Sequence, residues 1–175
     1  MKAVIITIFL CFASVLAFGQ KPIKTVYKIR AKDSTLIVTY QGKAHKLAIT
    51  EKIDAAKITD TDILFADRKD GFTYLIVNVS GWSKAKQDDR QCGAGVESNL
   101  LWIKLNPAWK ITEIKSAHYQ LCWSSIDADD GYKINGNLLN VEFNNFRDNV
   151  RVKLTYNAEL SELGFQILET KLKEN

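Results

Sequence analysis

The feature that most constrains this chain is a regular alternation of apolar and polar residues, broken by short turn sequences. In "NVRVKLTY" (149–156) apolar residues take every second position, with polar or charged residues between them. Successive side chains of a strand point to opposite faces, so this pattern predicts an antiparallel strand with one buried face. In "GYKINGNLLNVEF" (131–143) the Asn135-Gly136 pair predicts a tight type I′ hairpin turn, which needs positive φ angles.

Similar turn sequences separate other pairs of predicted strands. Gln41-Gly42 lies between "STLIVTY" and "KAHKLAI", and Lys69-Asp70-Gly71 lies between "DILFADR" and "FTYLIVNV". We therefore predict an all-β fold, a single-domain antiparallel sandwich or open barrel of about eight to ten strands. The segments "TEKIDAAKITDTD" and "SELGFQILETKL" have a less regular pattern. Helices in these segments would give the alternative, an α+β fold with one or two short helices.

The first residues have the pattern of a secretory signal peptide. Lys2 precedes an apolar run, and the small residues Ala17 and Gly19 stand just before Gln20. We expect residues 1–19 to be this leader and residues 20–175 to form one β-rich domain. The run is shorter than the about 20 residues that a membrane helix needs, and no comparable run follows. The chain is therefore predicted to be secreted or periplasmic, with no transmembrane segment after the leader is removed.

The cysteines fit this compartment. Cys11 lies in the predicted leader, which leaves Cys92 and Cys122 in a setting where disulfides persist. We predict that these two form a disulfide. The bond would close a loop of about 31 residues and stabilise the fold by about 3 to 4 kcal/mol in the chain-entropy model.

Two other uses of these cysteines remain open at this point. A Cys92–His118 pair would suit thiol catalysis, and Cys92, Cys122 and His118 together would suit zinc. His45 is the second histidine of the chain. There is no CxxC pair and no second cysteine-histidine cluster. We therefore predict no metal site, no cofactor and no catalytic residue.

One region breaks the strand pattern, the polar segment from Gly81 to Ser98. Long irregular loops are uncommon inside compact domains and are often functional. A disulfide at Cys92 would fix this loop to the domain, so we regard it as the candidate binding loop. The alternative is a solvated connector. Its candidate contact residues are Trp82, Lys84, Lys86, Asp88, Asp89, Arg90 and Glu97.

The four tryptophans raise the possibility of carbohydrate binding, because flat aromatic faces stack on sugar rings. Trp102 alternates with Leu101 and Ile103, so we expect it on the opposite face of a buried strand. We expect Trp109 after "NPA" and Trp123 beside Cys122 to be packing residues as well. Trp82 has the most polar surroundings of the four.

Three acidic residues, Asp127, Asp129 and Asp130, lie close together in "SSIDADDGY". The stretch does not match a calcium-binding loop, so a solvated turn is the simpler interpretation. The same carboxylates could pair with Glu97 or Glu142 as the acid and base of a glycosidase.

Charge excludes one class of partner. The chain has 24 basic and 20 acidic residues, and the small excess is spread along the predicted strands, unlike the basic stripe of a nucleic-acid binder. We therefore predict a disulfide-stapled β-domain that acts as a binding or accessory protein, or an inhibitor, in the cell envelope. Its partner would be a protein or polysaccharide of the envelope. The alternatives are a carbohydrate-binding module and an envelope hydrolase that uses Cys92 and His118 or a carboxylate pair.

Overall fold

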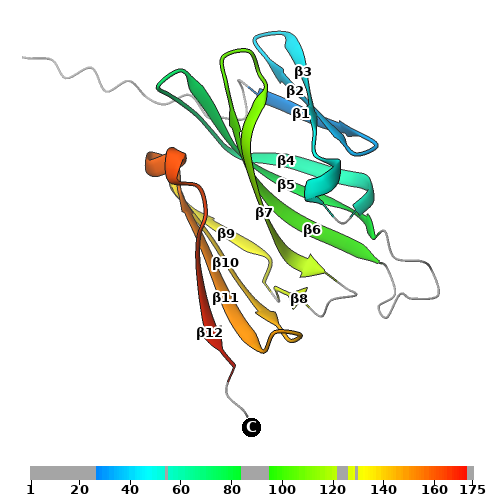
Figure 1. Cartoon of the computed structure of the whole chain (residues 1–175), viewed down its shortest axis with the longest axis vertical. Coiled ribbons are helices and arrows are strands. Elements are labelled where there is room, and N and C mark those ends of the chain that lie inside the picture. Colours follow the sequence, from blue (N-terminus) through cyan, green and yellow to red (C-terminus); the bar gives the residue numbers. More distant parts are fainter. Residues whose placement is uncertain (1–26, 54, 84–94, 122–125, 129, 173–175) are drawn as a thin grey trace, which may run out of the picture.

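A computed structural model describes residues 27–172, except for 54, 84–94, 122–125 and 129. This part contains two 3₁₀-helices, η2 (Thr50–Lys52) and η5 (Ala158–Leu163). The described residues otherwise form strands and their connections (Figure 1). The strands are β1 (Tyr27–Lys32), β2 (Thr35–Tyr40), β3 (Lys43–Ala48), β4 (Ala55–Lys69), β5 (Phe72–Ser83), β6 (Val96–Leu105), β7 (Ile111–Leu121), β8 (Ile126–Asp127), β9 (Tyr132–Asn135), β10 (Leu138–Asn145), β11 (Val150–Asn157) and β12 (Gln166–Lys171).

The strands form two antiparallel sheets. The smaller sheet has the order β1-β2-β3, and the larger has the order β12-β11-β10-β8-β7-β6-β5-β4, with β9 paired to β10. The prediction of an all-β fold is therefore confirmed. The described residues hold twelve strands, somewhat more than predicted, in part because one of them, β8, is only two residues long.

Strands β4 to β7 form a middle layer that is covered on both faces. One hydrophobic cluster lies between these strands and β10, β11 and η5, and a second lies between them and the three-stranded sheet. In Figure 1 the blue strands β1 to β3 and the yellow to red strands β9 to β12 lie on either side of the green strands. The larger sheet therefore folds back over itself, as in a sandwich, and the smaller sheet adds an outer layer.

Strand β6 shows why the middle layer needs so apolar a sequence. Leu100 and Trp102 belong to the cluster shared with β10 and β11, whereas Leu101, Ile103 and Leu105 belong to the cluster under the small sheet. A strand that is buried on both faces has a continuous run of apolar residues in place of an alternation. The prediction that Trp102 lies on the opposite face from Leu101 and Ile103 is confirmed.

The hairpin turns follow the glycines, with one correction. Gln41 and Gly42, and likewise Asp70 and Gly71, all have positive φ angles, as type I′ turns require. In the third hairpin Asn135 still pairs with Leu138, so the two turn residues are 136 and 137. Gly136 alone has a positive φ there, +57°. The predicted type I′ turn centred on Asn135-Gly136 is therefore wrong, because a turn with a positive φ at its first central residue alone has the II′ pattern.

Both segments with an unclear pattern combine a short helix with a strand. The first gives η2 followed by β4, and the second contains the end of η5 followed by β12. Neither provides the long helix of an α+β layer.

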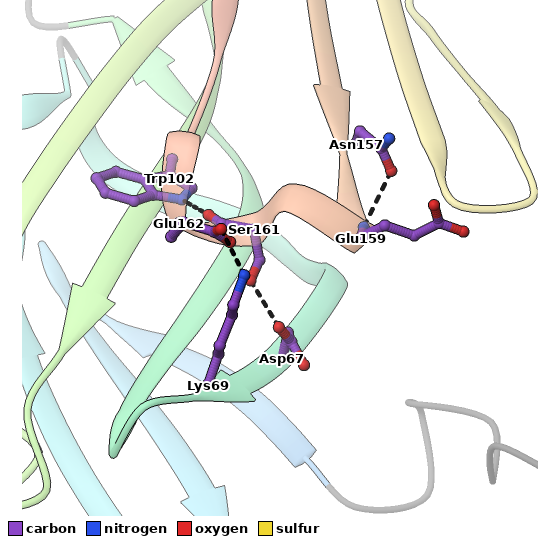
Figure 2. Close-up of polar contacts among 7 residues, drawn as sticks. All are labelled: Asp67, Lys69, Trp102, Asn157, Glu159, Ser161 and Glu162. Atoms are coloured by element: carbon purple, nitrogen blue, oxygen red, sulfur yellow. Dashed lines mark hydrogen bonds and ion pairs between the residues drawn. The ribbon is translucent and has the colours of Figure 1, made fainter. Parts of the chain in front are cut away.

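Helix η5 closes one end of the core between β4 and β11, where side-chain contacts hold it (Figure 2). The Trp102 indole Nε1–H donates to the Ser161 carbonyl oxygen at 2.8 Å, and the Ser161 hydroxyl donates to Asp67 at 2.6 Å. Lys69 forms an ion pair with Glu162 at the rim. The Trp102–Ser161 bond is buried, whereas the Ser161–Asp67 and Lys69–Glu162 contacts are partly buried, so the bond from the indole fixes the position of the helix most firmly.

Candidate functional site

The site begins at the turn between β6 and β7, which the sequence "NPAWK" builds. The Trp109 backbone N–H donates to the Asn106 carbonyl oxygen at 2.9 Å. The Asn106 side-chain oxygen accepts from the backbone N–H groups of Ala108 and Lys110, both at 3.0 Å. Asn favours such a turn because its side chain caps the following backbone, and Pro107 has the φ angle that the next position needs.

Trp109 has an unusual backbone conformation in this turn. Its φ angle is +60°, in the left-handed region where glycine is the usual residue of such a loop. This conformation costs an ordinary residue about 1 to 2 kcal/mol. Strained residues of this kind are often found at functional sites, where neighbouring contacts hold them in place.

The neighbouring contacts come from the small sheet. The His45 ring of β3 stacks on the Trp109 indole, with ring centroids 4.0 Å apart and planes 9° apart. Tyr40 of β2 lies 5.6 Å from the same indole, and Tyr27 of β1 stacks on Tyr40 at 4.8 Å. Three strands and one distant turn thus contribute to a continuous group of four rings. We call this group the aromatic patch.

The aromatic patch borders an open pocket of about 340 Å³. This volume is in the range of small-molecule sites. The pocket has flat ring surfaces and several polar groups but no carboxylate among its lining residues, which are Tyr40, Gln41, Lys43, His45, Pro107, Ala108 and Trp109.

The Tyr40 hydroxyl is oriented by two donors. The Gln41 side-chain amide donates to its oxygen at 3.1 Å, and the Arg68 guanidinium donates at 3.2 Å. A phenol oxygen has two acceptor positions and one proton. Because both acceptor positions are used, the Tyr40 proton remains as a donor beside the pocket. Neither ring nitrogen of His45 has a hydrogen-bond partner among the described residues, so both are available to a ligand.

The electrostatics keep the inner tyrosine neutral. Burial, with the neighbouring Tyr40 as a smaller cause, raises the pKa of Tyr27 to about 12, although Arg68 acts in the opposite direction. A tyrosine is protonated at neutral pH in any case, and the raised pKa of Tyr27 extends the neutral form to alkaline pH, so Tyr27 supports Tyr40 as an uncharged ring.

Substitutions at Trp109 test whether its backbone is strained. We expect the free energy of unfolding of Trp109→Gly to exceed that of Trp109→Ala by about 1 kcal/mol, because glycine adopts a positive φ without a steric cost. Urea unfolding of both variants measures the difference. The matched control is Ala108→Gly at the preceding residue, whose φ is not positive. The free energy of unfolding of Ala108→Gly should be about 0.5 to 1 kcal/mol lower than that of the unaltered protein. The strain is disproved if Trp109→Ala proves more stable than Trp109→Gly.

The candidate binding loop is shorter than the sequence indicated. Strands β5 and β6 continue into it, so that Trp82 pairs with Val96 and Gly81 pairs with Glu97. Trp82 lies at the end of β5 and is 46% exposed, while Glu97 lies in β6 and is 0% exposed. Glu97 is therefore a buried strand residue and does not offer its side chain to a partner from the surface. The other five candidate residues, Lys84, Lys86, Asp88, Asp89 and Arg90, lie outside the described residues, and their role stays a prediction.

The cysteines also lie outside the described residues, so the disulfide stays a prediction. The described strands are compatible with it, because Leu121, next to Cys122 in the chain, pairs with Glu97 at the start of β6. Cys92 is five residues before Glu97 in the sequence. His118 pairs with Asn99 in the same ladder and is only partly exposed. The Cys92–His118 catalytic pair is likewise untested.

Three of the carboxylates considered as a glycosidase pair lie together in a second cavity, away from the aromatic patch. Asp127, Asp130 and Glu142 line this cavity, of about 250 Å³, together with Lys133 and Arg151. Glu97 is not among the lining residues, and Asp129 and Trp123 lie outside the described part of the chain.

Ion pairs limit what these carboxylates could do. Arg151 lies 2.7 Å from Glu142, and Lys133 lies 2.7 Å from Asp130. The hydrogen bond from Lys133 lowers the pKa of Asp130. A general acid needs a raised pKa, so a charged and paired carboxylate does not suit that role. We therefore prefer the aromatic patch as the candidate site.

The sequence did not predict this site. We expected Trp109 to be a packing residue, and the indole does pack partly against the core under the small sheet. The available signal was the position of a large ring directly after Asn-Pro-Ala, at a turn where a small residue is usual. Tyr40 and His45 gave no local signal, because they meet Trp109 only through the packing of two sheets.

In the described ranges, no three histidine, cysteine or acidic side chains are grouped so that they could hold a metal ion. Nor does that part of the chain contain a helix with the length and apolar character needed to cross a bilayer. No protein-family model, curated protein or solved structure matches the chain.

Proposed function

We propose that this chain is an exported binding domain of the cell envelope, and that it recognises a glycan by stacking a sugar ring in the pocket of the aromatic patch. The observation that carries this proposal is Trp109, a large ring that has a positive φ, stacks on His45 and lines an open pocket. A role in packing alone would not require a strained residue at this position, where glycine would fit without cost.

The chemistry of the pocket suits a sugar. A pyranose ring presents C–H groups on its faces, which complement the negative face of an aromatic ring, and hydroxyls around its edge. Tyr40 and Trp109 would supply the ring surface that their stacks on Tyr27 and His45 leave open to the pocket. The Tyr40 hydroxyl, Gln41 and Lys43 would supply polar partners for the hydroxyls. Apolar surfaces with a few oriented polar groups are typical of specific small-ligand sites. The predicted leader would bring the domain to the compartment in which envelope polysaccharides are found.

Affinity measurements with the exported protein test the proposal. The probes are dextran, xylan, chitin oligosaccharides, laminarin and polygalacturonate, used in affinity electrophoresis and calorimetry. We expect at least one probe to bind, and Trp109→Ala to weaken that binding about tenfold or more, which corresponds to the loss of one stacked aromatic ring.

The matched control is Trp82→Ala, which removes an exposed indole that does not line the pocket. This variant should bind like the unaltered protein. Circular dichroism shows whether each variant is folded, and Tyr40→Phe provides a second test because it removes only the hydroxyl. The proposal is wrong if no probe binds, or if Trp82→Ala loses affinity while Trp109→Ala keeps it.

A further inference from the structure

The small sheet has an unusual charge. Strands β1, β2 and β3 contain five basic residues and no acidic residue, although the whole chain is nearly balanced, with 24 basic and 20 acidic residues. The five are Lys28, Arg30, Lys32, Lys43 and Lys46. A positive field is thus concentrated on one outer layer of the molecule.

The register places four of these cations on a single face. Tyr27, Ile29 and Ala31 of β1 face the core, so Lys28, Arg30 and Lys32 lie on the outer side. Alternate residues of a strand are about 6.6 to 6.8 Å apart, so the three form a regular row. Lys46 of β3 lies on the same side, two strands away from Arg30. We call these four residues the basic face.

The basic face contains one buried apolar residue. Ile37 lies at its centre, paired with Arg30 on one side and Lys46 on the other. It is on the outer side of the sheet, yet only 6% of it is exposed. The aliphatic stems of long basic side chains can cover such a residue while their charged ends stay in water. Arg30 and Lys46 are in the register positions to cover Ile37 in this way.

The cations of the basic face are not neutralised within the described part of the chain. None of the four forms an ion pair there, whereas Lys69, Lys133 and Arg151 each have a carboxylate partner. A concentration of unpaired like charge raises the local concentration of anions and speeds their association. The basic face therefore favours an anionic partner.

We infer that the glycan bound at the aromatic patch is an acidic polysaccharide, and that the basic face contacts its carboxylate or sulfate groups. This inference rests on the proposed function, since it assigns the charge of the same ligand. The two regions lie on opposite faces of the small sheet and come together around one end of it. Tyr27 pairs with Tyr40, and Tyr40 pairs with Lys43, so these three residues share the inner face, and Tyr40 and Lys43 line the pocket. Lys28, the first cation of the row, directly follows Tyr27. A polymer is long enough to contact both regions, whereas a single sugar is not.

The test compares an acidic polymer with a neutral one. Affinities for polygalacturonate and dextran are measured at several salt concentrations with the full exported protein. The variant K28Q/R30Q/K32Q removes three charges from the basic face and leaves the pocket residues intact. We expect it to bind polygalacturonate about tenfold more weakly at low salt, with a reduced dependence on salt, and to bind dextran as before.

The matched control is K57Q/R147Q/K171Q, which removes two lysines and one arginine at exposed positions elsewhere. It causes the same change in net charge and should leave polygalacturonate binding nearly unchanged. An equal loss in both triple variants would show that only net charge matters, and the basic face would then have no specific role.

The remaining outcomes separate the inference from the proposed function. If Trp109→Ala loses glycan binding while K28Q/R30Q/K32Q does not, the proposed function stands and the assignment of an acidic ligand is wrong. If K28Q/R30Q/K32Q loses polygalacturonate but Trp109→Ala binds every glycan normally, the proposed function is wrong. Vesicles of phosphatidylcholine with phosphatidylglycerol provide the last comparison. The polysaccharide assignment is overturned if these vesicles bind more tightly than polygalacturonate and depend on the same three cations, because the partner would then be a membrane.

Discussion

Replacing Gly164 by alanine should lower the free energy of unfolding by about 3 kcal/mol, as the sum of two costs. Gly164 ends η5 with φ +71° and ψ −151°. This conformation is almost restricted to glycine, and another residue there costs about 1 to 3 kcal/mol. In addition, a Cβ atom at this position would lie 3.2 Å from Trp102 Cδ2 and 3.3 Å from Cε2. The indole cannot easily move away, because it is 1% exposed and bonded to the Ser161 carbonyl.

Gly136→Ala is the matched control for this effect. Gly136 has φ +57° in a hairpin turn, and a Cβ there would have nothing within 4 Å. Its cost should therefore be that of the backbone conformation alone, about 1 kcal/mol. Urea unfolding measures the free energy of unfolding of both variants. The additional loss in Gly164→Ala reports the cost of the rarer backbone conformation together with the contact with Trp102. Equal losses in the two variants would show that the contact with Trp102 has no energetic role.

Truncation of Trp102 to alanine should have the largest effect of any single substitution considered, a loss of about 3 to 5 kcal/mol. The indole is buried beneath η5. The centroid of the Tyr74 ring lies 6.0 Å from the indole centroid, and the Lys115 ammonium lies 4.9 Å from the indole centroid. Its removal leaves a cavity and also takes the buried donor away from the Ser161 carbonyl. A loss of this size would be a large part of the stability of a domain of ordinary size.

Two further variants separate these contributions. Trp102→Phe keeps most of the ring but removes the Nε1–H, so the unpaired Ser161 carbonyl should account for about 1 to 3 kcal/mol. Trp82→Ala removes an indole that is 46% exposed and should cost about 1 kcal/mol or less. If Trp102→Ala were no more destabilising than Trp82→Ala, the proposed role of the indole in joining η5 to the core would be wrong.

The sequence predicted those parts of the fold that depend on local patterns. The alternation in "NVRVKLTY" became β11, with Val152, Leu154 and Tyr156 buried, because a strand with one buried face needs that spacing. The type I′ turns at Gln41-Gly42 and Asp70-Gly71 also depend only on neighbouring residues. The third hairpin turn was misplaced by one residue, since Asn and Gly can both adopt positive φ and the pairing of β9 with β10 decides between them.

The candidate site could not be predicted in the same way. Trp109 is far in the chain from Tyr40 and His45, which share one hairpin, and it meets them because one sheet packs on the other. No local pattern encodes that contact. The buried position of Glu97 had a similar cause, because its polar neighbours in the sequence indicated a loop, whereas pairing with Gly81 and Leu121 extends β6 through this stretch. Local sequence patterns thus predict the strands but not the surfaces that the packing of the strands brings together.

The two-residue strand β8 has a consequence for how the molecule opens. Within the described residues it is the strand that joins the two halves of the large sheet, since Ile126 pairs with Leu121 on one side and with Asn145 on the other. Backbone hydrogen bonds therefore hold the halves together over a very short ladder, and the shared core supplies most of their cohesion. We expect strands β9 to β12 to separate as one cooperative unit at a lower free energy than global unfolding. Their amide protons should then exchange with solvent before those of β5 and β6, which are enclosed on both faces.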